Sequence, residues 1–222
     1  MKVIIPARGG SKRIPKKNTK LLDGVPILSH VVRELRQIPE VDEIVITTDD
    51  DDIALLANTL GLSVPFVRSS SLSTDTAGTL EVIQDAIYRL MYSEKDLVLV
   101  VYPTSIFFRH EDVRDAVALC MDGKRLVFAA TAYGHPYQRG FHIENSQPRF
   151  IDRAALTART QDLEKLYHDA GQFYLTTAGH WAARKAILAE EDVVAKVLPR
   201  VSIDIDNESD WLLAEAVHKC LM

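Results

Sequence analysis

The sequence has few of the features that mark secreted, membrane or metal-scaffold proteins. It contains only two cysteines in 222 residues, and its seven histidines show no zinc-type spacing. No apolar run approaches the ~20 residues that a membrane-spanning helix requires. We therefore expect a cytoplasmic protein without a signal peptide or membrane segment, in which Cys120 and Cys220 are buried on helices in a reducing compartment.

Two familiar phosphate-binding patterns are also missing. The chain contains neither the Walker pattern G-x-x-x-x-G-K-[ST] nor G-x-G-x-x-G. A surplus of positive charge is absent as well, because 26 Lys and Arg face 31 Asp and Glu, which gives a net charge of -5. This balance argues against nucleic acid as the main partner. The hydrophobic content of 47% is enough for the core of a full α/β domain.

Acidic residues are missing from the first twenty positions, which form the most informative stretch of the chain. The apolar run Val3–Ile5 is typical of a buried parallel strand, and Gly9-Gly10 follows shortly after it. Six cations surround these glycines, namely Arg8, Lys12, Arg13, Lys16, Lys17 and Lys20. Glycines let backbone N–H groups turn toward an oxyanion that cations neutralise. The stretch therefore predicts a phosphate-binding loop; a solvated basic loop and a nucleic-acid contact are the alternatives.

Strand and helix patterns alternate along the first 131 residues. Strands are expected at 43–48, 64–67, 97–101 and 126–131, and helices at 26–37, 49–60, 80–90 and 113–120. The alternation predicts a three-layer α/β fold, in which helices cover both faces of a mostly parallel sheet. Ligands of such sheets bind at the carboxyl ends of the strands. Arg8, Asp49, Arg68 and Thr104 each follow a strand, so they should converge on one crevice.

The alternation breaks between Tyr133 and Lys165, where polar and aromatic residues lack clean periodicity. Within this stretch, Phe141–Ile143 and Arg149–Ile151 predict a hairpin. We interpret residues 133–165 as an excursion from a single domain spanning 1–222, which covers the site or reaches a partner in a homodimer. The sheet should resume at 172–175 and 193–197. Helices are expected at 178–188 and at the C-terminus, where Leu213, Val217 and Cys220 should be buried.

Two aspartates, Asp204 and Asp206, lie two residues apart near the end of the chain. In an extended segment both carboxylates would point the same way. Hard oxygen ligands suit Mg²⁺, which also binds substrate phosphates. The alternative is that Asp206 caps the last helix and Asp204 is a surface residue. Together with the basic loop, the pair predicts a site for a nucleoside triphosphate and Mg²⁺.

An ordered set of motifs resembles the cytidylyltransferases that activate nonulosonic acids, the nine-carbon sialic-like sugars. The motifs are Ile5-Pro6-Ala7-Arg8-Gly9-Gly10-Ser11-Lys12-Arg13, Lys17-Asn18, Thr47-Thr48-Asp49, Arg68, Asp75-Thr76-Ala77, Pro103-Thr104-Ser105 and Asp204-Ile205-Asp206. Residues 159–163 and 167–174 look like the pseudaminic acid subgroup, whereas sialic acid enzymes carry a glutamine where this chain has Tyr102. Ile106 in place of a proline and Leu175 in place of a tryptophan depart from that subgroup.

The resemblance implies a Rossmann-like nucleotidyltransferase that transfers CMP from CTP to the anomeric hydroxyl of an acidic nine-carbon sugar, with release of pyrophosphate. Pseudaminic acid is the sugar that the motifs favour. Sialic, legionaminic and ketodeoxyoctonic acids are alternatives, and a non-catalytic nucleotide-binding paralogue is a further one. The implied cofactor is Mg²⁺, held by Asp204 and Asp206.

The resemblance also implies residue roles. Arg8, Lys17 and Asp206 would be catalytic. The nucleotide would be bound by Ala7, Arg8, Gly9, Gly10, Ser11, Lys12, Asn18, Arg68, Ala77 and Thr79, with help from Arg13. The sugar would be bound by Tyr102, Gln138, Arg139, Arg159, His168, Asp169, Gln172 and Tyr174. Tyr102 and Tyr174 could equally be core aromatics.

Overall fold

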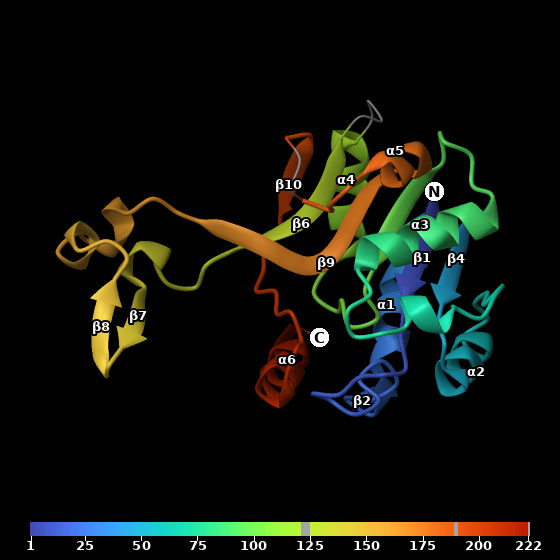
Figure 1. Ribbon diagram of the computed structural model, residues 1–222, viewed down its shortest axis with the longest axis horizontal. Helices are drawn as coiled ribbons and strands as arrows, with labels where there is room; N and C mark the ends of the chain where they lie inside the picture. The colour runs from blue at the N-terminus through green and yellow to red at the C-terminus, as the bar shows by residue number, and fades with distance from the viewer. Residues whose placement is uncertain (121–124, 189–190, 222) are drawn as a thin grey trace.

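A six-stranded sheet organises the computed structural model, which describes residues 1–120, 125–188 and 191–221 (Figure 1). The strand order is β10-β6-β9-β5-β1-β4. These strands are β1 (Lys2–Pro6), β4 (Glu43–Thr47), β5 (Leu97–Val101), β6 (Leu126–Ala132), β9 (Tyr167–Thr177) and β10 (Val193–Val197). Neighbours pair in parallel except β9, which is antiparallel to both β5 and β6. The predicted mostly parallel sheet is thus confirmed, with β5 in its interior.

Helices cover both faces of the sheet, because successive strand residues point to opposite sides. Val3 and Ile5 belong to one core and Ile4 to the other. Side chains of α1 (Ile27–Leu35), α2 (Asp51–Thr59), α4 (His110–Leu119) and α6 (Glu208–Leu221) join the first core. Those of α3 (Thr79–Leu90) and α5 (Ala178–Ala183) join the second. The three-layer architecture is therefore confirmed; within the described ranges, no helix has the length and apolarity that a membrane crossing needs.

The segment expected to be a strand at 64–67 does not form one. It contributes only isolated bridges, Val45 to Ser63 and Thr48 to Val67. Pro65 lacks a backbone N–H and so cannot continue a ladder. A short 3-10 turn, η1 (Ser70–Leu72), follows before α3 begins.

Two helix predictions also need correction. The helix expected at 178–188 ends at Ala183, because Arg184 is extended and its buried side chain binds Ala186 O and Asp192. In α6 the prediction that Leu213 and Cys220 are buried is wrong, since Leu213 is 55% exposed and Cys220 is exposed. Trp211, Ala214 and His218 are buried instead. Trp211 lies under the Lys20 ammonium and His218 binds Asp23, and these contacts set the face that α6 buries.

The predicted excursion leaves the body of the molecule between β6 and β9 (Figure 1). We call residues 133–166 the arm; it contains η2 (Tyr137–Arg139), β7 (Phe141–Glu144), β8 (Gln147–Phe150), η3 (Ala154–Leu156) and η4 (Thr160–Asp162). The expected hairpin is confirmed as the β7–β8 pair, whose turn residues Asn145 and Ser146 have positive φ. A smaller hairpin, β2 (Leu21–Leu22) with β3 (Val25–Pro26), follows the basic loop.

Candidate active site

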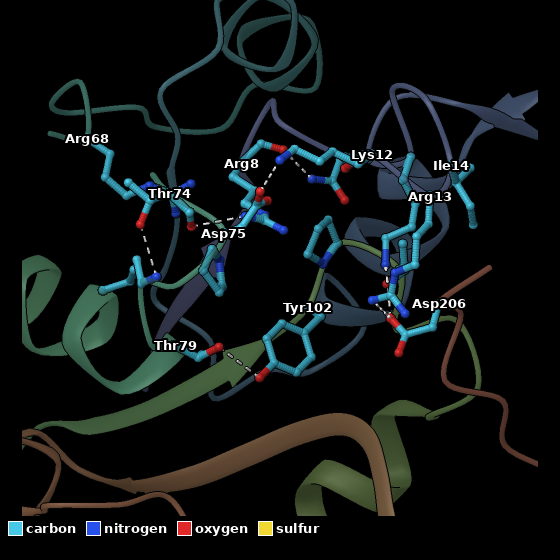
Figure 2. Close-up of a pocket in the computed structure, with 18 of the residues that line it drawn as sticks. Arg8, Lys12, Arg13, Ile14, Arg68, Thr74, Asp75, Thr79, Tyr102 and Asp206 are labelled. Atoms are coloured by element: carbon cyan, nitrogen blue, oxygen red, sulfur yellow. Dashed lines mark hydrogen bonds and ion pairs between the residues drawn. The ribbon is translucent and has the colours of Figure 1, made fainter. Parts of the chain in front are cut away.

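A pocket of about 270 Å³ opens where β1 and β5 end, on the side of the sheet at which the basic loop emerges (Figure 2). Its lining includes Arg8, Ser11, Lys12, Arg13, Lys17, Asn18, Arg68, Thr74, Asp75, Ala77, Thr79, Tyr102, Thr104 and Asp206. Asp49 stands directly behind, with its Oδ1 3.3 Å from Arg68 Nη2. The prediction that these strand-end residues converge is therefore confirmed.

The C-terminal segment folds back onto the basic loop. Arg13 Nη2 lies 3.0 Å from Asp206 Oδ1, and Lys17 Nζ donates to Ile205 O at 2.7 Å. Asn18 Nδ2 donates to Arg8 O at 2.8 Å, so this hydrogen bond connects the start of the basic loop to residue 18. Burial lowers the pKa of Lys17, while the carboxylates of Asp206 and Asp204 oppose that shift. Cations and carboxylates from opposite ends of the chain thus share one wall of the pocket.

A second acidic contact reaches the loop from residues 73–78, on the opposite wall. Arg8 Nη1 donates to Thr74 O at 3.0 Å and to Asp75 Oδ1 at 2.9 Å (Figure 2). Lys12 forms an ion pair with the other oxygen of Asp75. In the sequence, Asp75 belongs to the motif Asp75-Thr76-Ala77, which predicts no separate role for its carboxylate. Nothing in the local sequence could have predicted a contact between residues 67 positions apart.

The two glycines have different surroundings. The Gly9 amide donates to Asp49 Oδ1 at 3.1 Å, and a Cβ at Gly9 would lie 2.3 Å from Asp50 Oδ2. Gly10 is exposed, with nothing within 4 Å of an added Cβ. Ala7 is fully buried. Of these neighbouring residues, Ser11 belongs to the described lining of the pocket, whereas Ala7, Gly9 and Gly10 do not.

Arg68 and the following loop form the end of the pocket opposite Asp206. Arg68 is 4% exposed, and its guanidinium donates to Asp49, to Thr47 O at 3.4 Å and to Ser73 Oγ at 3.2 Å. The Ala77 amide donates to Thr74 Oγ1 at 3.1 Å. These contacts link Arg68 to the ends of two neighbouring segments and tie Ala77 to Thr74.

Two tyrosines, Tyr102 and Tyr174, contact each other between the pocket and Asp169. The Tyr102 hydroxyl donates to Thr79 Oγ1 at 3.3 Å, and the rings of Tyr102 and Tyr174 meet edge to face with centroids 5.9 Å apart. Tyr174 is buried in the core and donates to Asp169 Oδ2 at 2.5 Å. Burial raises the pKa of the Tyr174 phenol, so it remains a protonated donor. Tyr102 therefore lines the pocket, whereas Tyr174 supports it and positions Asp169.

Gln172 is buried among backbone groups. It is 1% exposed; its Oε1 accepts from Phe107 N at 2.9 Å and its Nε2 donates to Ala170 O at 3.1 Å. Its side chain holds the loop after β5 against β9.

Four predicted sugar-binding residues lie in or beside the arm. Gln138 donates to Glu164 O at 2.9 Å, and Arg139 donates to Ala155 O, Ala158 O and Thr160 Oγ1. Arg159 pairs with Asp162 at 2.8 Å, and the His168 ring packs 4.7 Å from that of Tyr133. The described lining of the pocket in this chain includes none of the four.

Asp206 lines the other end of the pocket, whereas Asp204 is not among the described lining residues. Gly171 has a φ of +62°, and a Cβ there would lie 3.0 Å from Asp204 Cγ, so only glycine lets the two segments approach. Asp204 keeps exposed surface, yet the protein packed around it raises its pKa, and the Asp206 charge adds to this. Asn207 Oδ1 accepts from Asp210 N at 3.1 Å, so the first turn of α6 is capped by Asn207 and the alternative role for Asp206 is wrong.

The donors available to a metal are few. Across residues 1–120, 125–188 and 191–221, no cluster of three or more His, Cys, Asp or Glu is arranged to hold an ion. Two carboxylates nevertheless suit Mg²⁺, which keeps several waters and binds substrate phosphates in such sites. The mutual repulsion that raises the pKa of Asp204 is also what a bound cation would relieve.

Comparisons with known proteins identify the family of the chain. The profile of a family described as Cytidylyltransferase matches residues 2–194. A pseudaminic acid cytidylyltransferase of Campylobacter jejuni is 37% identical over 97% of this chain and 95% of its own length. A CMP-N,N'-diacetyllegionaminic acid synthase of Legionella pneumophila is 33% identical over 96% of this chain and 93% of its own length.

Solved structures show the same fold. A CMP:2-keto-3-deoxy-manno-octonic acid synthetase complexed with CTP superposes with a TM-score of 0.72 at 15% identity, covering 99% of this chain and 98% of its own. A 4-diphosphocytidyl-2C-methyl-D-erythritol synthase gives 0.69 at 14% identity, covering 98% of both chains. These structures confirm the predicted Rossmann-like nucleotidyltransferase fold. The family profile and the sequence relatives show that the chain belongs to the cytidylyltransferase family.

Proposed function

We propose that the protein transfers CMP from CTP to the anomeric hydroxyl of an acidic nine-carbon sugar, and that pseudaminic acid is its preferred acceptor. The observation that carries the proposal is the pocket itself, in which four cations of one loop lie between the Arg68 end and Asp206. A triphosphate fits the cationic middle, and a nucleoside fits the end formed by Arg68, Ala77 and Thr79. The Campylobacter and Legionella relatives named for such reactions support the choice of acceptor.

The chain's own residues supply most of the reaction's requirements. The oxygen of the anomeric hydroxyl forms a bond to the α-phosphorus and its proton is released to water. The bond from that phosphorus to the oxygen it shares with the β-phosphorus breaks, so negative charge moves onto pyrophosphate. Arg8 and Lys12 on one wall, and Arg13 and Lys17 on the other, stabilise that charge. Tyr102 would lie between the nucleotide and a sugar bound beside Asp169, whose carboxylate is held by the buried Tyr174 hydroxyl.

Asp204 and Asp206 would hold Mg²⁺, which when bound neutralises phosphate oxygens and lowers the pKa of the attacking hydroxyl. Arg13 and Lys17 neutralise Asp206 in the structure, with Nη2 at 3.0 Å and Nζ at 4.0 Å from Oδ1. The same two cations are therefore close enough to share phosphates with the aspartate pair. We further place the reaction in the cytoplasm, as expected for a chain with only two cysteines.

The acceptor is tested with a panel of sugars. Purified enzyme, CTP and Mg²⁺ are supplied with pseudaminic, legionaminic, sialic or ketodeoxyoctonic acid, and pyrophosphate release is followed. We expect the highest kcat/KM with pseudaminic acid, because the 159–163 and 167–174 segments carry that subgroup's residues. A higher kcat/KM with another sugar would reassign the acceptor, and no release with any sugar would support the non-catalytic paralogue.

We propose a homodimer in which the arm covers the partner's site. The arm exposes large apolar side chains, with Phe141 52%, Ile143 75% and Ile151 45% exposed. It also extends away from the sheet and helices of its own chain (Figure 1), and the described lining of the pocket includes no residue of the arm. Arg139 and its neighbours in the arm could therefore meet a sugar only in a pocket of a second subunit.

Light scattering at micromolar concentration should give twice the 24.8 kDa mass of one chain. Replacing Phe141 and Ile143 by serine should shift the protein toward monomer, because the exposed face of the hairpin loses its apolar groups. Leu55→Ser is the matched control, since Leu55 is 67% exposed on α2, outside the arm. A wild-type mass of one chain would contradict the proposal.

A further inference from the structure

Asp75 occupies the pocket in the manner of a bound anion. Its two carboxylate oxygens face two different cations of the basic loop, Arg8 at 2.9 Å and Lys12 (Figure 2). All three residues line the pocket. A carboxylate that bridges an arginine and a lysine makes the contacts that a phosphate group makes. The structure therefore holds an internal anion at the place where the proposed triphosphate needs its cations.

The contact is suited to exchange. The side chains of Arg8, Lys12 and Asp75 are 39%, 79% and 44% exposed, so water can replace each partner when the pair opens. The hydrogen bond from Lys12, with the charges of Lys12 and Arg8, holds the pKa of Asp75 below its ordinary value. Asp75 is thus a carboxylate at neutral pH and competes with other anions for the same two cations.

The loop that carries Asp75 also reaches the nucleoside end. Thr74 accepts from Arg8 through its backbone oxygen and from the Ala77 amide through its hydroxyl. Two residues beyond Ala77, Thr79 accepts from Tyr102. Residues 74–77 are consequently connected to the Arg8 side chain by hydrogen bonds. A phosphate that replaces Asp75 as the partner of Arg8 would change the contacts of this loop, which lies at the proposed nucleoside end of the pocket.

We propose that Asp75 is a positioning residue that exchanges with phosphate: it occupies Arg8 and Lys12 in the nucleotide-free enzyme and returns to them as pyrophosphate leaves. The inference rests on the proposed function for the identity of the leaving group. Its effect is to keep the cations ordered between turnovers and to shorten the residence of pyrophosphate. CTP compensates for displacing Asp75 because it also contacts the nucleoside end of the pocket, whereas pyrophosphate does not.

The test is calorimetric titration of Asp75→Asn with inorganic pyrophosphate and Mg²⁺. Removing the competing charge should tighten pyrophosphate binding by about fivefold to tenfold, the effect of one like-charge interaction near a protein surface. The inhibition constant of pyrophosphate during turnover should fall in the same proportion. Asp75→Ser removes the same charge with a smaller side chain and serves if the asparagine variant does not fold.

Asp52→Asn is the matched control. Asp52 pairs with Lys16 of the same basic loop at 2.7 Å and is 64% exposed, but neither residue lines the pocket that Arg8, Lys12 and Asp75 line. The control removes one negative charge from the same region, but not one that pairs with Arg8 or Lys12. Pyrophosphate binding should therefore stay at the wild-type value. Cytidine, which has no phosphate, should bind both variants as it binds the wild type.

The proposal is overturned if Asp75→Asn binds pyrophosphate no more tightly than the wild type, or if Asp52→Asn tightens binding equally. Weaker binding of both pyrophosphate and cytidine would instead make Asp75 a structural support of the loop, and so would also overturn it. Calorimetry does not depend on turnover. An enzyme that fails to use any sugar, yet shows tighter pyrophosphate binding on Asp75→Asn, would refute the proposed function alone.

Discussion

Replacing Arg8 with alanine should lower the rate of nucleotidyl transfer by about 10²–10³-fold, roughly 3–4 kcal/mol of transition-state stabilisation, while weakening CTP binding far less. Arg8 lies two residues beyond Pro6, the last residue of β1, and its side chain lines the pocket. In the proposed reaction, Lys12, Arg13 and Lys17, which line the same pocket, would share the ground-state affinity for the triphosphate. The charge that develops on departing pyrophosphate is new in the transition state and needs a donor already in place.

Single-turnover kinetics at saturating CTP and Mg²⁺, beside calorimetric titration of CTP, separate the two effects. Arg8→Lys should rescue only partly, since an ammonium cannot make the planar two-pronged contact of a guanidinium. Lys16→Ala is the control, because Lys16 lies in the same loop but pairs with Asp52, and neither residue lines the pocket that Arg8 lines. A normal rate in Arg8→Ala with weak CTP binding would make Arg8 a docking residue.

Replacing Asp206 with alanine should abolish detectable turnover and leave the fold intact. The carboxylate is 48% exposed, and the α6 cap is made by Asn207 and Asp210, so few stabilising contacts are lost. The variant loses one of two proposed Mg²⁺ ligands and the counter-ion of Arg13. Both losses fall at the reacting phosphates, whereas CTP binding keeps its other cations.

The assay is pyrophosphate release at low millimolar Mg²⁺, with thermal unfolding as the check on folding. Glu215→Ala is the matched control, because it removes a carboxylate from α6 whose ion pair among the described residues is with Lys219 at 3.2 Å. It should keep wild-type activity. Near-normal turnover in Asp206→Ala would remove the aspartate pair from the mechanism.

Much of the sheet could be predicted, because its signals are local. Val3–Ile5 and Leu97–Val101 are continuous apolar runs, and strands buried on both faces require such runs. The basic loop could also be predicted, because its glycines and cations all lie within residues 8–20, directly after a strand. Because Arg8, Arg68 and Thr104 each follow a predicted strand, the sequence predicts that they lie in one crevice, and all three line the pocket.

The features that could not be predicted depend on contacts between distant segments. The buried face of α6 is set by Lys20 and Asp23, which lie nearly two hundred residues earlier. Asp75 reaches Arg8 only because the loop before α3 folds over the end of β1. Gln172 reads as a polar group of the site, yet the amide of Phe107 and the carbonyl of Ala170 take its side chain.

Phosphorus NMR of a reaction containing the enzyme, CTP, Mg²⁺ and pseudaminic acid tests cytidylyl transfer most directly, because it reports which phosphorus changes its partner. We predict that the three CTP resonances are replaced by one phosphodiester resonance of the CMP-sugar and one resonance of free pyrophosphate, in equal molar amounts. Conversion of CTP to CDP and inorganic phosphate, or an unchanged CTP spectrum with every acidic sugar supplied, would contradict it.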